Sequence, residues 1–215
     1  MKILIIGAHG HVGQLTTKLL ADQGNQVYGG IRDTAQNDEI KTLGGIPVTY
    51  DLLGSVADMA KTIADIKPDA IVFTAGSGGH GGQSGTLNID LDGAVKTMEA
   101  AQQAAVKRFI MVSAFGTGDR EFWANSSIRG YYVAKYYADQ WLQLRTNLQY
   151  TILRPGTLTN DEPTGEINLS GATTGDLTVT RADVAAVIAA VLDNSQTIGE
   201  IYTFVNGDEP IDEAF

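Results

Sequence analysis

Short apolar segments alternate with longer amphipathic segments along most of the chain. The apolar segments have the composition of strands that are buried on both faces, as in a parallel sheet covered by helices. We expect strands at Ile3–Ile6, Gln26–Ile31, Ile46–Tyr50, Ala70–Thr74, Arg108–Ser113 and Tyr150–Leu153, and a last strand at Ile201–Val205 that closes the sheet. Arg154-Pro155-Gly156 is expected to stop the sixth strand. The stretch from Thr157 to Thr178 is expected to be irregular apart from a short strand at Ile167–Leu169.

Apolar residues recur at helical spacing between these strands. On the first helix they are Val12, Leu15, Leu19 and Leu20. We expect this helix to end near Gln23, because Gly24 is a typical C-terminal stop. Further helices are expected at about Asn37–Leu43, after the cap Ser55, at about Thr86–Ala105, at about Gly130–Arg145 and after the capping box Thr180–Asp183. A polar loop that holds Phe122 and Trp123 is expected before the Gly130 helix.

Strands that alternate with helices in this way form a doubly wound parallel α/β sheet. No repeat or linker divides the chain, so we expect a single domain over residues 1–215. A small segment at about 156–180 is left to form the substrate side.

Three glycines lie between the first strand and the first helix, in the sequence GAHGHVG. Strand, glycine turn and helix in this order place unpaired backbone N–H groups and the positive end of a helix dipole where a pyrophosphate can bind. We expect Gly7 to permit the tight turn, Gly10 the close approach of phosphate, and Gly13 the contact between helix and strand. The pattern predicts a Rossmann-type NAD(P)-binding fold.

The amino-acid composition limits the classes of binding partner and of site that we expect. The chain has 15 Lys and Arg residues against 25 Asp and Glu residues, a formal net charge of −10, which argues against nucleic acid or an anionic membrane as the main partner. Cysteine is absent, which excludes disulfides, a thiol nucleophile and a zinc–thiolate site. No apolar run approaches the roughly 20 residues that span a bilayer, and the N-terminus lacks a signal-peptide pattern, so we expect a cytoplasmic protein.

Arg32 stands at the end of the second strand, about 20 residues after the glycine turn, where an acidic residue would bind the ribose hydroxyls of NAD. An arginine suits the 2′-phosphate of NADP, through charge-assisted hydrogen bonds. Two alternatives remain: Asp33 turns toward the ribose instead, or Arg32 is only a solvated charge. We expect NADP as the cofactor ahead of NAD.

These residues resemble a known family, the short-chain dehydrogenase/reductases, specifically their atypical NAD(P)H-binding branch with its NmrA-like and flavin-reductase-like members. The likeness covers nearly the whole chain and rests on GAHGHVG, IRD, TAGSGG, YTILRPG, TRADVA and GDEPIDEAF, with His9 where Thr is common. It implies that Asp51 lies near the adenine, that Ala75 and Gly76 lie along the adenosine, and that Pro155 lies near the nicotinamide. The full set of cofactor-binding residues that it implies is Gly7, His9, Gly10, His11, Val12, Gly13, Arg32, Asp51, Leu52, Ala75, Gly76, Ser77, Lys135, Pro155 and Gly156.

Tyr131 and Lys135 form a YxxxK pair, and a spacing of four puts both side chains on one helix face. Hydride transfer to a carbonyl needs a proton donor at the developing alkoxide, so the pKa of the phenol must fall toward neutrality. A lysine ammonium nearby favours phenolate and can also hold the cofactor ribose. Ser113 is placed to hydrogen-bond the same substrate oxygen. Together these three resemble the catalytic Ser, Tyr and Lys of the family.

Other interpretations compete with this one. Tyr132, Tyr136 and Tyr137 crowd the same helix, which is also typical of a half-buried packing face. Asp90 stands where extended members of the family carry an Asn of the proton relay, and several atypical members bind the dinucleotide without using this tyrosine.

The remaining candidates are weaker. No acidic residue stands at metal-ligand spacing from His9, His11 or His80, so we expect no metal site, and we expect His80 to decorate a mobile loop that could face the substrate. Arg154 and Arg181 are either anion binders or partners of Asp183 or a neighbouring carboxylate.

The leading hypothesis is an NADPH-dependent oxidoreductase that acts on a small or medium carbonyl, quinone or flavin-like acceptor. Residues 156–215 are too few to build a lobe as large as that of the sugar-nucleotide epimerases. We therefore expect a shallow pocket bounded by 75–85, 115–127 and 157–178, with a small molecule as the partner. The alternative is an NmrA-like regulator that senses NADP without turnover. Nothing in the sequence indicates whether the chain pairs with itself.

Overall fold

The computed structural model of this protein describes residues 1–79, 81–169 and 177–215. Within these ranges the main sheet has the order β11-β8-β10-β6-β5-β4-β1-β2-β3. Its parallel part consists of β3 (Ile46–Thr49), β2 (Gln26–Ile31), β1 (Lys2–Ile6), β4 (Ala70–Phe73), β5 (Arg108–Val112), β6 (Gln149–Pro155) and β10 (Glu200–Asn206). This order confirms the doubly wound, Rossmann-type α/β sheet.

The far edge of the sheet differs from the prediction. The strand predicted at Ile201–Val205 does not close the sheet, because β8 (Glu166–Asn168) pairs antiparallel with the end of β10 and β11 (Glu209–Pro210) pairs antiparallel with β8. β8 thus covers the edge of β10 at Val205 and Asn206, and β11 in turn covers β8.

The stretch after β6 is more regular than predicted. Arg154 and Pro155 belong to β6 instead of stopping it, and β7 (Thr157–Thr159) pairs in parallel with β9 (Thr178–Thr180). The predicted short strand at Ile167–Leu169 is present as β8. The part of the predicted irregular stretch at 170–176 lies outside the described residues.

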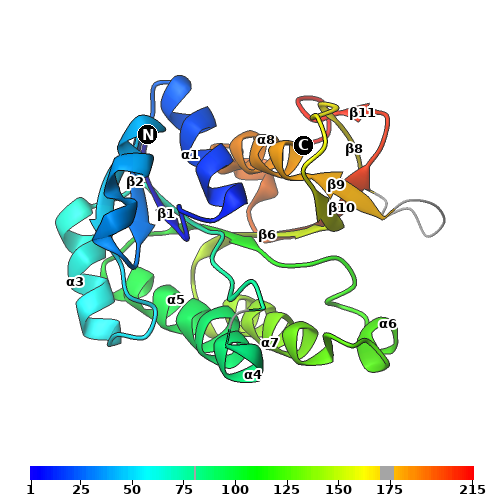
Figure 1. Ribbon diagram of the computed structural model, residues 1–215, viewed down its shortest axis with the longest axis horizontal. Helices are drawn as coiled ribbons and strands as arrows, with labels where there is room; N and C mark the ends of the chain where they lie inside the picture. The colour runs from blue at the N-terminus through cyan, green and yellow to red at the C-terminus, as the bar shows by residue number, and fades with distance from the viewer. Residues whose placement is uncertain (80, 170–176) are drawn as a thin grey trace.

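Helices cover both faces of the sheet (Figure 1). On one face lie α1 (His11–Asp22) and α8 (Arg181–Leu192), and on the other lie α3 (Val56–Ile66), α5 (Ala94–Gln103) and α7 (Arg129–Arg145). Shorter segments are η1 (Thr34–Gln36), α2 (Asn37–Thr42), α6 (Arg120–Ala124) and η3 (Ser195–Thr197). None of the helices in the described ranges is long and apolar enough to cross a bilayer.

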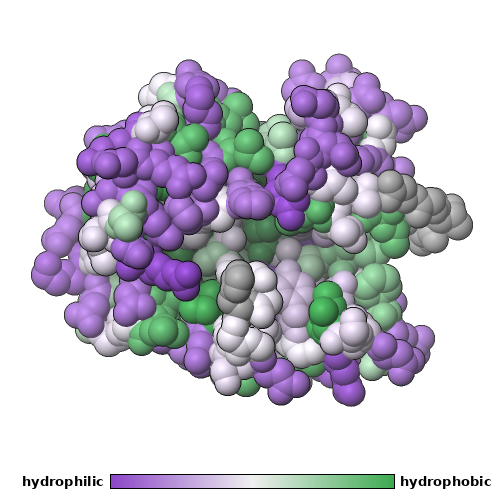
Figure 2. Space-filling model, in the orientation of Figure 1, coloured by the Kyte–Doolittle hydropathy of each residue, from purple (hydrophilic) through white to green (hydrophobic). Residues whose placement is uncertain are grey.

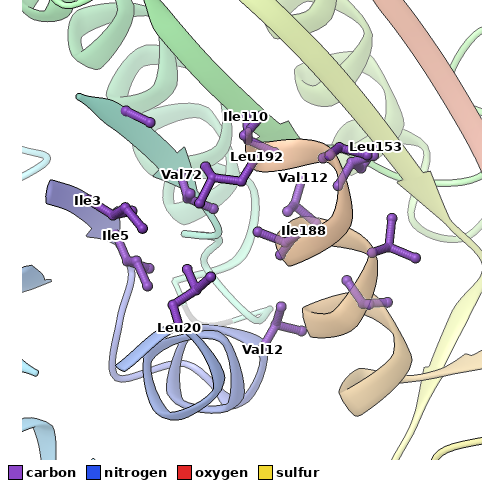
Figure 3. Packing of buried hydrophobic residues seen from close by; sticks show 14 of the residues in the cluster. Ile3, Ile5, Val12, Leu20, Val72, Ile110, Val112, Leu153, Ile188 and Leu192 are labelled. Carbon is purple, nitrogen blue, oxygen red and sulfur yellow. The ribbon is translucent and has the colours of Figure 1, made fainter. Parts of the chain in front are cut away.

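β1 lies inside the sheet and is covered by helices on both faces, so all of its central residues must be apolar. Ile3 and Ile5 point into the hydrophobic cluster under α1 and α8, whereas Leu4 and Ile6 point into the cluster under α3, α5 and α7. Figure 3 shows the first cluster, in which Leu20 of α1 and Ile188 of α8 pack beside the strands. Because successive strand residues face opposite sides, a strand covered on both sides has no position for a polar residue.

The apolar face of α1 lies slightly off the predicted one. Leu15 is 40% exposed, whereas Thr16 and Thr17 are fully buried. Each threonine hydroxyl donates to the carbonyl four residues earlier, on Val12 and Gly13, which satisfies its hydrogen bond inside the helix. Two buried threonines therefore occupy positions that the hydrophobic pattern assigned to the polar side.

Two further segments correct the predictions. The helix expected at Thr86–Ala105 begins earlier, with α4 (Gly82–Gly85), and passes through η2 (Thr86–Gly93), a π-helical segment, before α5. Phe122 and Trp123 lie in the short helix α6, capped by Asp119, and not in a loop. Trp123 is buried and donates its indole N–H to the Thr117 carbonyl, an interaction that only tertiary packing provides.

Candidate cofactor and catalytic site

The glycine turn joins β1 to α1 by backbone contacts that exclude larger residues. Gly7 has a φ of +87°, and a Cβ there would lie 2.7 Å from the backbone of Ala75. A Cβ at Gly13 would lie 2.3 Å from the Gly7 carbonyl oxygen. These distances agree with the predicted roles of Gly7 in the turn and of Gly13 in the helix–strand contact.

The N-terminus of α1 has no side-chain cap among the described residues. The N-cap is Gly10, and the first turn of the helix carries no acidic residue. Only the Gly7 carbonyl oxygen, at 3.3 Å, would meet a Cβ at Gly10. The first N–H groups of α1 therefore stay available, together with the positive end of the helix dipole.

A cavity of about 660 Å³ opens beside this turn. Figure 2 shows the hollow between the layer of α1 and α8 and the layer of α4 to α7. The predicted site residues in its wall are Gly10, His11, Val12, Ala75, Gly76, Ser77, Ser113, Tyr131 and Lys135. The cavity thus brings together the glycine turn, the loop after β4, the end of β5 and one face of α7.

Other predicted residues lie outside this wall. Gly7, His9 and Gly13 belong to the turn and the first residues of α1 but do not line the cavity. Arg32, Asp51 and Leu52 follow the ends of β2 and β3, also outside the wall. Pro155 and Gly156 are buried, and a Cβ at Gly156 would lie 2.3 Å from the Leu177 carbonyl oxygen. Of the predicted pocket boundaries, the wall includes Ser127 and Leu158 but not Phe115.

Lys135 and Tyr131 share one face of α7, as their spacing predicts. Lys135 is buried, and its ammonium group donates to the Val112 carbonyl at 3.1 Å. The Lys135 Nζ lies 5.7 Å from the centre of the Tyr131 ring. It also lies 3.7 Å from Oδ1 of Asp90, which η2 places against the cavity.

Ser113 is held by a second buried carboxylate. Its hydroxyl donates to Oδ2 of Asp139 at 3.0 Å, and Arg154 donates to the same oxygen through Nε at 3.0 Å and Nη2 at 2.9 Å. Burial raises the pKa of Asp139 above its ordinary value, while Arg154 and Ser113 oppose that shift. Arg154 is therefore a structural partner of a carboxylate, one of the two roles that the sequence allowed.

The phenol of Tyr131 stays protonated at neutral pH. Desolvation in the cavity wall raises its pKa, the Lys135 charge lowers it, and Asp90 and Asp139 raise it further. The pKa of Tyr131 is thus shifted up and not toward neutrality in this structure, because burial and two carboxylates outweigh one ammonium.

The strand ends on the adenosine side carry exposed groups. His9 pairs with Glu39 of α2 through Nε2 at 2.7 Å, and Gln14 bridges the Glu39 carboxylate and the His9 carbonyl. Asp33 accepts from the N–H of Ala35 and so caps η1. The Arg32 guanidinium makes no hydrogen bond or ion pair with any described residue.

Arg181 lines the cavity from α8. Arg181 does not pair with Asp183, because it donates to the Leu158 carbonyl and to Asn160, while Asp183 accepts from the N–H groups of Thr164 and Gly165. No cluster of potential metal ligands exists among the described residues, and His80 lies outside them.

The residues present fit a dinucleotide. An uncapped helix N-terminus, a turn of close-packed glycines and a cavity that reaches Lys135 provide places for a pyrophosphate and for a ribose-nicotinamide moiety.

Sequence reasoning missed Asp139 and Glu39. The first carried a signal, because Asp139 follows Lys135 by four residues, as Lys135 follows Tyr131, on the same helix face. The second carried none, since Glu39 meets His9 only after β1 and β2 have paired.

Comparison with known proteins agrees with this geometry. The family model described as NAD(P)H-binding matches residues 7–195. A Bacillus subtilis (strain 168) protein named "Uncharacterized sugar epimerase YhfK" is 40% identical over 215 residues, which cover 100% of this chain and 98% of that protein.

Solved structures are similar over the whole fold. The oxidoreductase ylbE from Lactococcus lactis is 36% identical with a TM-score of 0.86, and the match covers 100% of this chain and 94% of that one. ChuY from Escherichia coli O157:H7, described as an anaerobillin reductase, is 26% identical with a TM-score of 0.79, and the match covers 97% of this chain and 98% of that one.

Proposed function

Because the chain belongs to the NAD(P)H-binding family, we propose that it is an NADPH-dependent oxidoreductase that reduces a small carbonyl, quinone or flavin-like acceptor. One observation carries the proposal: a single cavity connects the anion-binding start of α1 with Tyr131 and Lys135 of α7. A cofactor site and a proton donor thus open into the same space, as hydride transfer requires.

Each part of the site has a role in this proposal. The N–H groups at the start of α1 bind the pyrophosphate, and Lys135 holds the ribose next to the nicotinamide. Arg32 binds the 2′-phosphate, because its guanidinium has no partner in the described chain and Asp33 is turned into the cap of η1. These roles favour NADPH over NADH.

Tyr131 supplies the proton. When bound, the reduced dinucleotide supplies a hydride to the acceptor, and the acceptor oxygen then needs a proton at the same place. Tyr131 lines the cavity, and its hydroxyl, with a raised pKa, carries the proton that the acceptor oxygen needs. Ser113, at the end of β5, borders the space for the acceptor oxygen, while its hydroxyl proton is held by Asp139.

The relatives support a reductase. The Lactococcus lactis relative is named an oxidoreductase, and the Escherichia coli relative is described as an anaerobillin reductase. Beyond β6, the described residues add only short strands, α8 and β10 to the main domain, which supports a small or medium acceptor.

Turnover tests the proposal directly. Purified protein is mixed with NADPH and a panel of quinones, aldehydes and flavins, and oxidation is followed by the absorbance of the reduced nicotinamide. We expect oxidation with at least one acceptor, and Tyr131→Phe to lower its rate by about 10²- to 10⁴-fold, because the phenol O–H is the proton donor. Tyr132→Phe is the matched control, because Tyr132 contacts the Tyr131 ring but does not line the cavity.

The opposite result has a defined meaning. Tight NADPH binding without oxidation by any acceptor would contradict the enzyme and favour an NADP-sensing regulator. Equal rates for the Tyr131→Phe and Tyr132→Phe variants would remove Tyr131 from the role of acid.

A further inference from the structure

Asp90 is a buried charge beside the proposed proton donor. The side chain is 1% exposed and lines the cavity. Its Oδ2 accepts from the N–H of Ser77 at 3.0 Å, but its Oδ1 has no hydrogen-bond partner among the described residues. A Cβ at Gly76 would lie 2.9 Å from that Oδ1. A residue with a side chain at position 76 would therefore collide with the Asp90 carboxylate.

The helix that carries Asp90 is locally distorted. Asp90 lies within η2, whose π-helical turns contain more residues than α-helical turns. This segment holds Oδ1 of Asp90 3.7 Å from Nζ of Lys135, both groups being almost completely buried. Charges at this separation interact strongly where water is excluded.

This pairing changes what Lys135 does to Tyr131. An isolated ammonium would favour the ionised phenol, but Asp90 offsets the positive charge and itself disfavours a second anion nearby. The cation and the carboxylate together leave the Tyr131 hydroxyl in a nearly neutral, desolvated environment, in which the neutral phenol is the stable form.

The other charged groups near Tyr131 do not reverse this balance. Asp139 acts in the same direction as Asp90 and raises the pKa of Tyr131, although Arg154 donates two hydrogen bonds to it. His11 and Arg181 reach the cavity from the opposite layer, where Arg181 is held by the Leu158 carbonyl and Asn160.

Ser113 leaves Tyr131 as the main donor. The Ser113 hydroxyl proton points to Asp139, so its oxygen presents lone pairs to the cavity. A developing oxyanion on the acceptor must then receive its proton from Tyr131, and a tyrosinate would have none to give.

We propose that Asp90 is a positioning residue that keeps the Tyr131 hydroxyl protonated, so that Tyr131 enters the proton step as a donor. The inference rests on the proposed function. In the proton step, the O–H bond of Tyr131 breaks, its proton bonds to the acceptor oxygen, and a proton from solvent then restores the Tyr131 hydroxyl.

The titration of Tyr131 tests this without any acceptor. Tyrosinate absorbance is measured against pH for the wild type and for Asp90→Asn, and each curve is compared with that of the same protein carrying Tyr131→Phe. We expect Tyr131 to titrate above about pH 10 in the wild type and about one pH unit lower in Asp90→Asn. The side-chain oxygen of the asparagine can still accept from the N–H of Ser77, so the variant keeps the hydrogen bond that joins this side chain to the loop after β4.

Asp92→Asn is the matched control. It removes the same charge from the same helical segment, but Asp92 pairs with Lys96 on the outside, away from the cavity. We expect it to leave the Tyr131 titration unchanged. An unchanged titration in Asp90→Asn, or an equal shift in Asp92→Asn, would overturn the proposal.

The wild type provides a test even where the variant does not fold. A Tyr131 midpoint below about pH 9 in the wild type would show that Lys135 dominates and would overturn the proposal. Failure to find an acceptor would count against the proposed enzyme, whereas these titrations judge Asp90 alone, so the two failures are distinguishable.

Discussion

The largely buried polar side chains beneath the cavity and the exposed ones at the strand ends beyond its wall are held in different ways. We call the largely buried set, Asp90, Ser113, Lys135, Asp139 and Arg154, the cavity floor. Of these, Asp90, Ser113 and Lys135 line the cavity, and Asp139 and Arg154 lie behind Ser113. Asp90 and Asp139 are 1% and 0% exposed, and each floor side chain bonds to a group on another element.

The nucleotide rim consists of His9, Arg32, Asp33, Glu39 and Asp51. Here the His9–Glu39 pair has side chains that are 41% and 47% exposed, and Asp33 and Asp51 accept hydrogen bonds from the nearby N–H groups of Ala35 and Leu53. The floor is therefore a largely buried network that links several parts of the chain, whereas the rim carries charges that are exposed to water.

Substitutions in the floor and in the rim should therefore have different effects on the stability of the fold and on ligand binding. A buried ion pair that loses one partner leaves an uncompensated charge, so changes in the floor should destabilise the fold. A solvated charge that loses its partner is screened by water, so changes in the rim should alter ligand affinity and little else.

The largest effect is expected from Asp139→Asn. The change leaves the Arg154 guanidinium, 13% exposed at its side chain, without a counter-charge and weakens the anchor of Ser113. We expect the free energy of unfolding in urea to fall by about 3 to 5 kcal/mol. Asp65→Asn, which breaks the exposed pair with Lys61, is the control and should cost less than about 1 kcal/mol. Equal losses would show that the floor is no more coupled to stability than the surface.

Arg32→Ala should act on affinity alone. Without the guanidinium, NADP should bind about 1.5–3 kcal/mol more weakly by calorimetry, while NAD affinity changes little, because only NADP carries the 2′-phosphate. The unfolding free energy should stay within about 0.5 kcal/mol of the wild type. Arg145→Ala, exposed at the end of α7, serves as the charge-matched control. Parallel losses for both dinucleotides would remove Arg32 from phosphate recognition.

The smallest effect is expected from Glu39→Gln. Glutamine retains an oxygen for Gln14 but loses the charge opposite His9. Because both side chains of the pair are partly solvated, we expect a loss of about 0–1 kcal/mol in urea unfolding. A loss above about 2 kcal/mol would show that the His9–Glu39 pair contributes to stability as much as a buried pair does, which would contradict the distinction between floor and rim.

Sequence reasoning succeeded where a pattern is local. The glycine spacing, the YxxxK pair and the unbroken apolar strands each depend on neighbours a few residues away, and the structure places all three as predicted. It failed at Leu15, where two threonines satisfy their hydroxyls within α1, and at β10, which pairs antiparallel with β8, a strand from a distant part of the chain.

The parallel sheet and the glycine turn before α1 could be predicted from the sequence. Strand burial and helix spacing are written in residues that stand next to one another, because the backbone repeats every two or 3.6 residues. The sequence also placed Tyr131 and Lys135 on one face.

The ion pairs in and beneath the cavity could not be predicted from the sequence, because they depend on tertiary contacts. Asp90 meets Lys135 across 45 residues of chain, and Arg154 meets Asp139 from a different element. How strongly such charges interact depends on their separation in space and on the exclusion of water, and neither quantity exists until the sheet and its two layers of helices have packed.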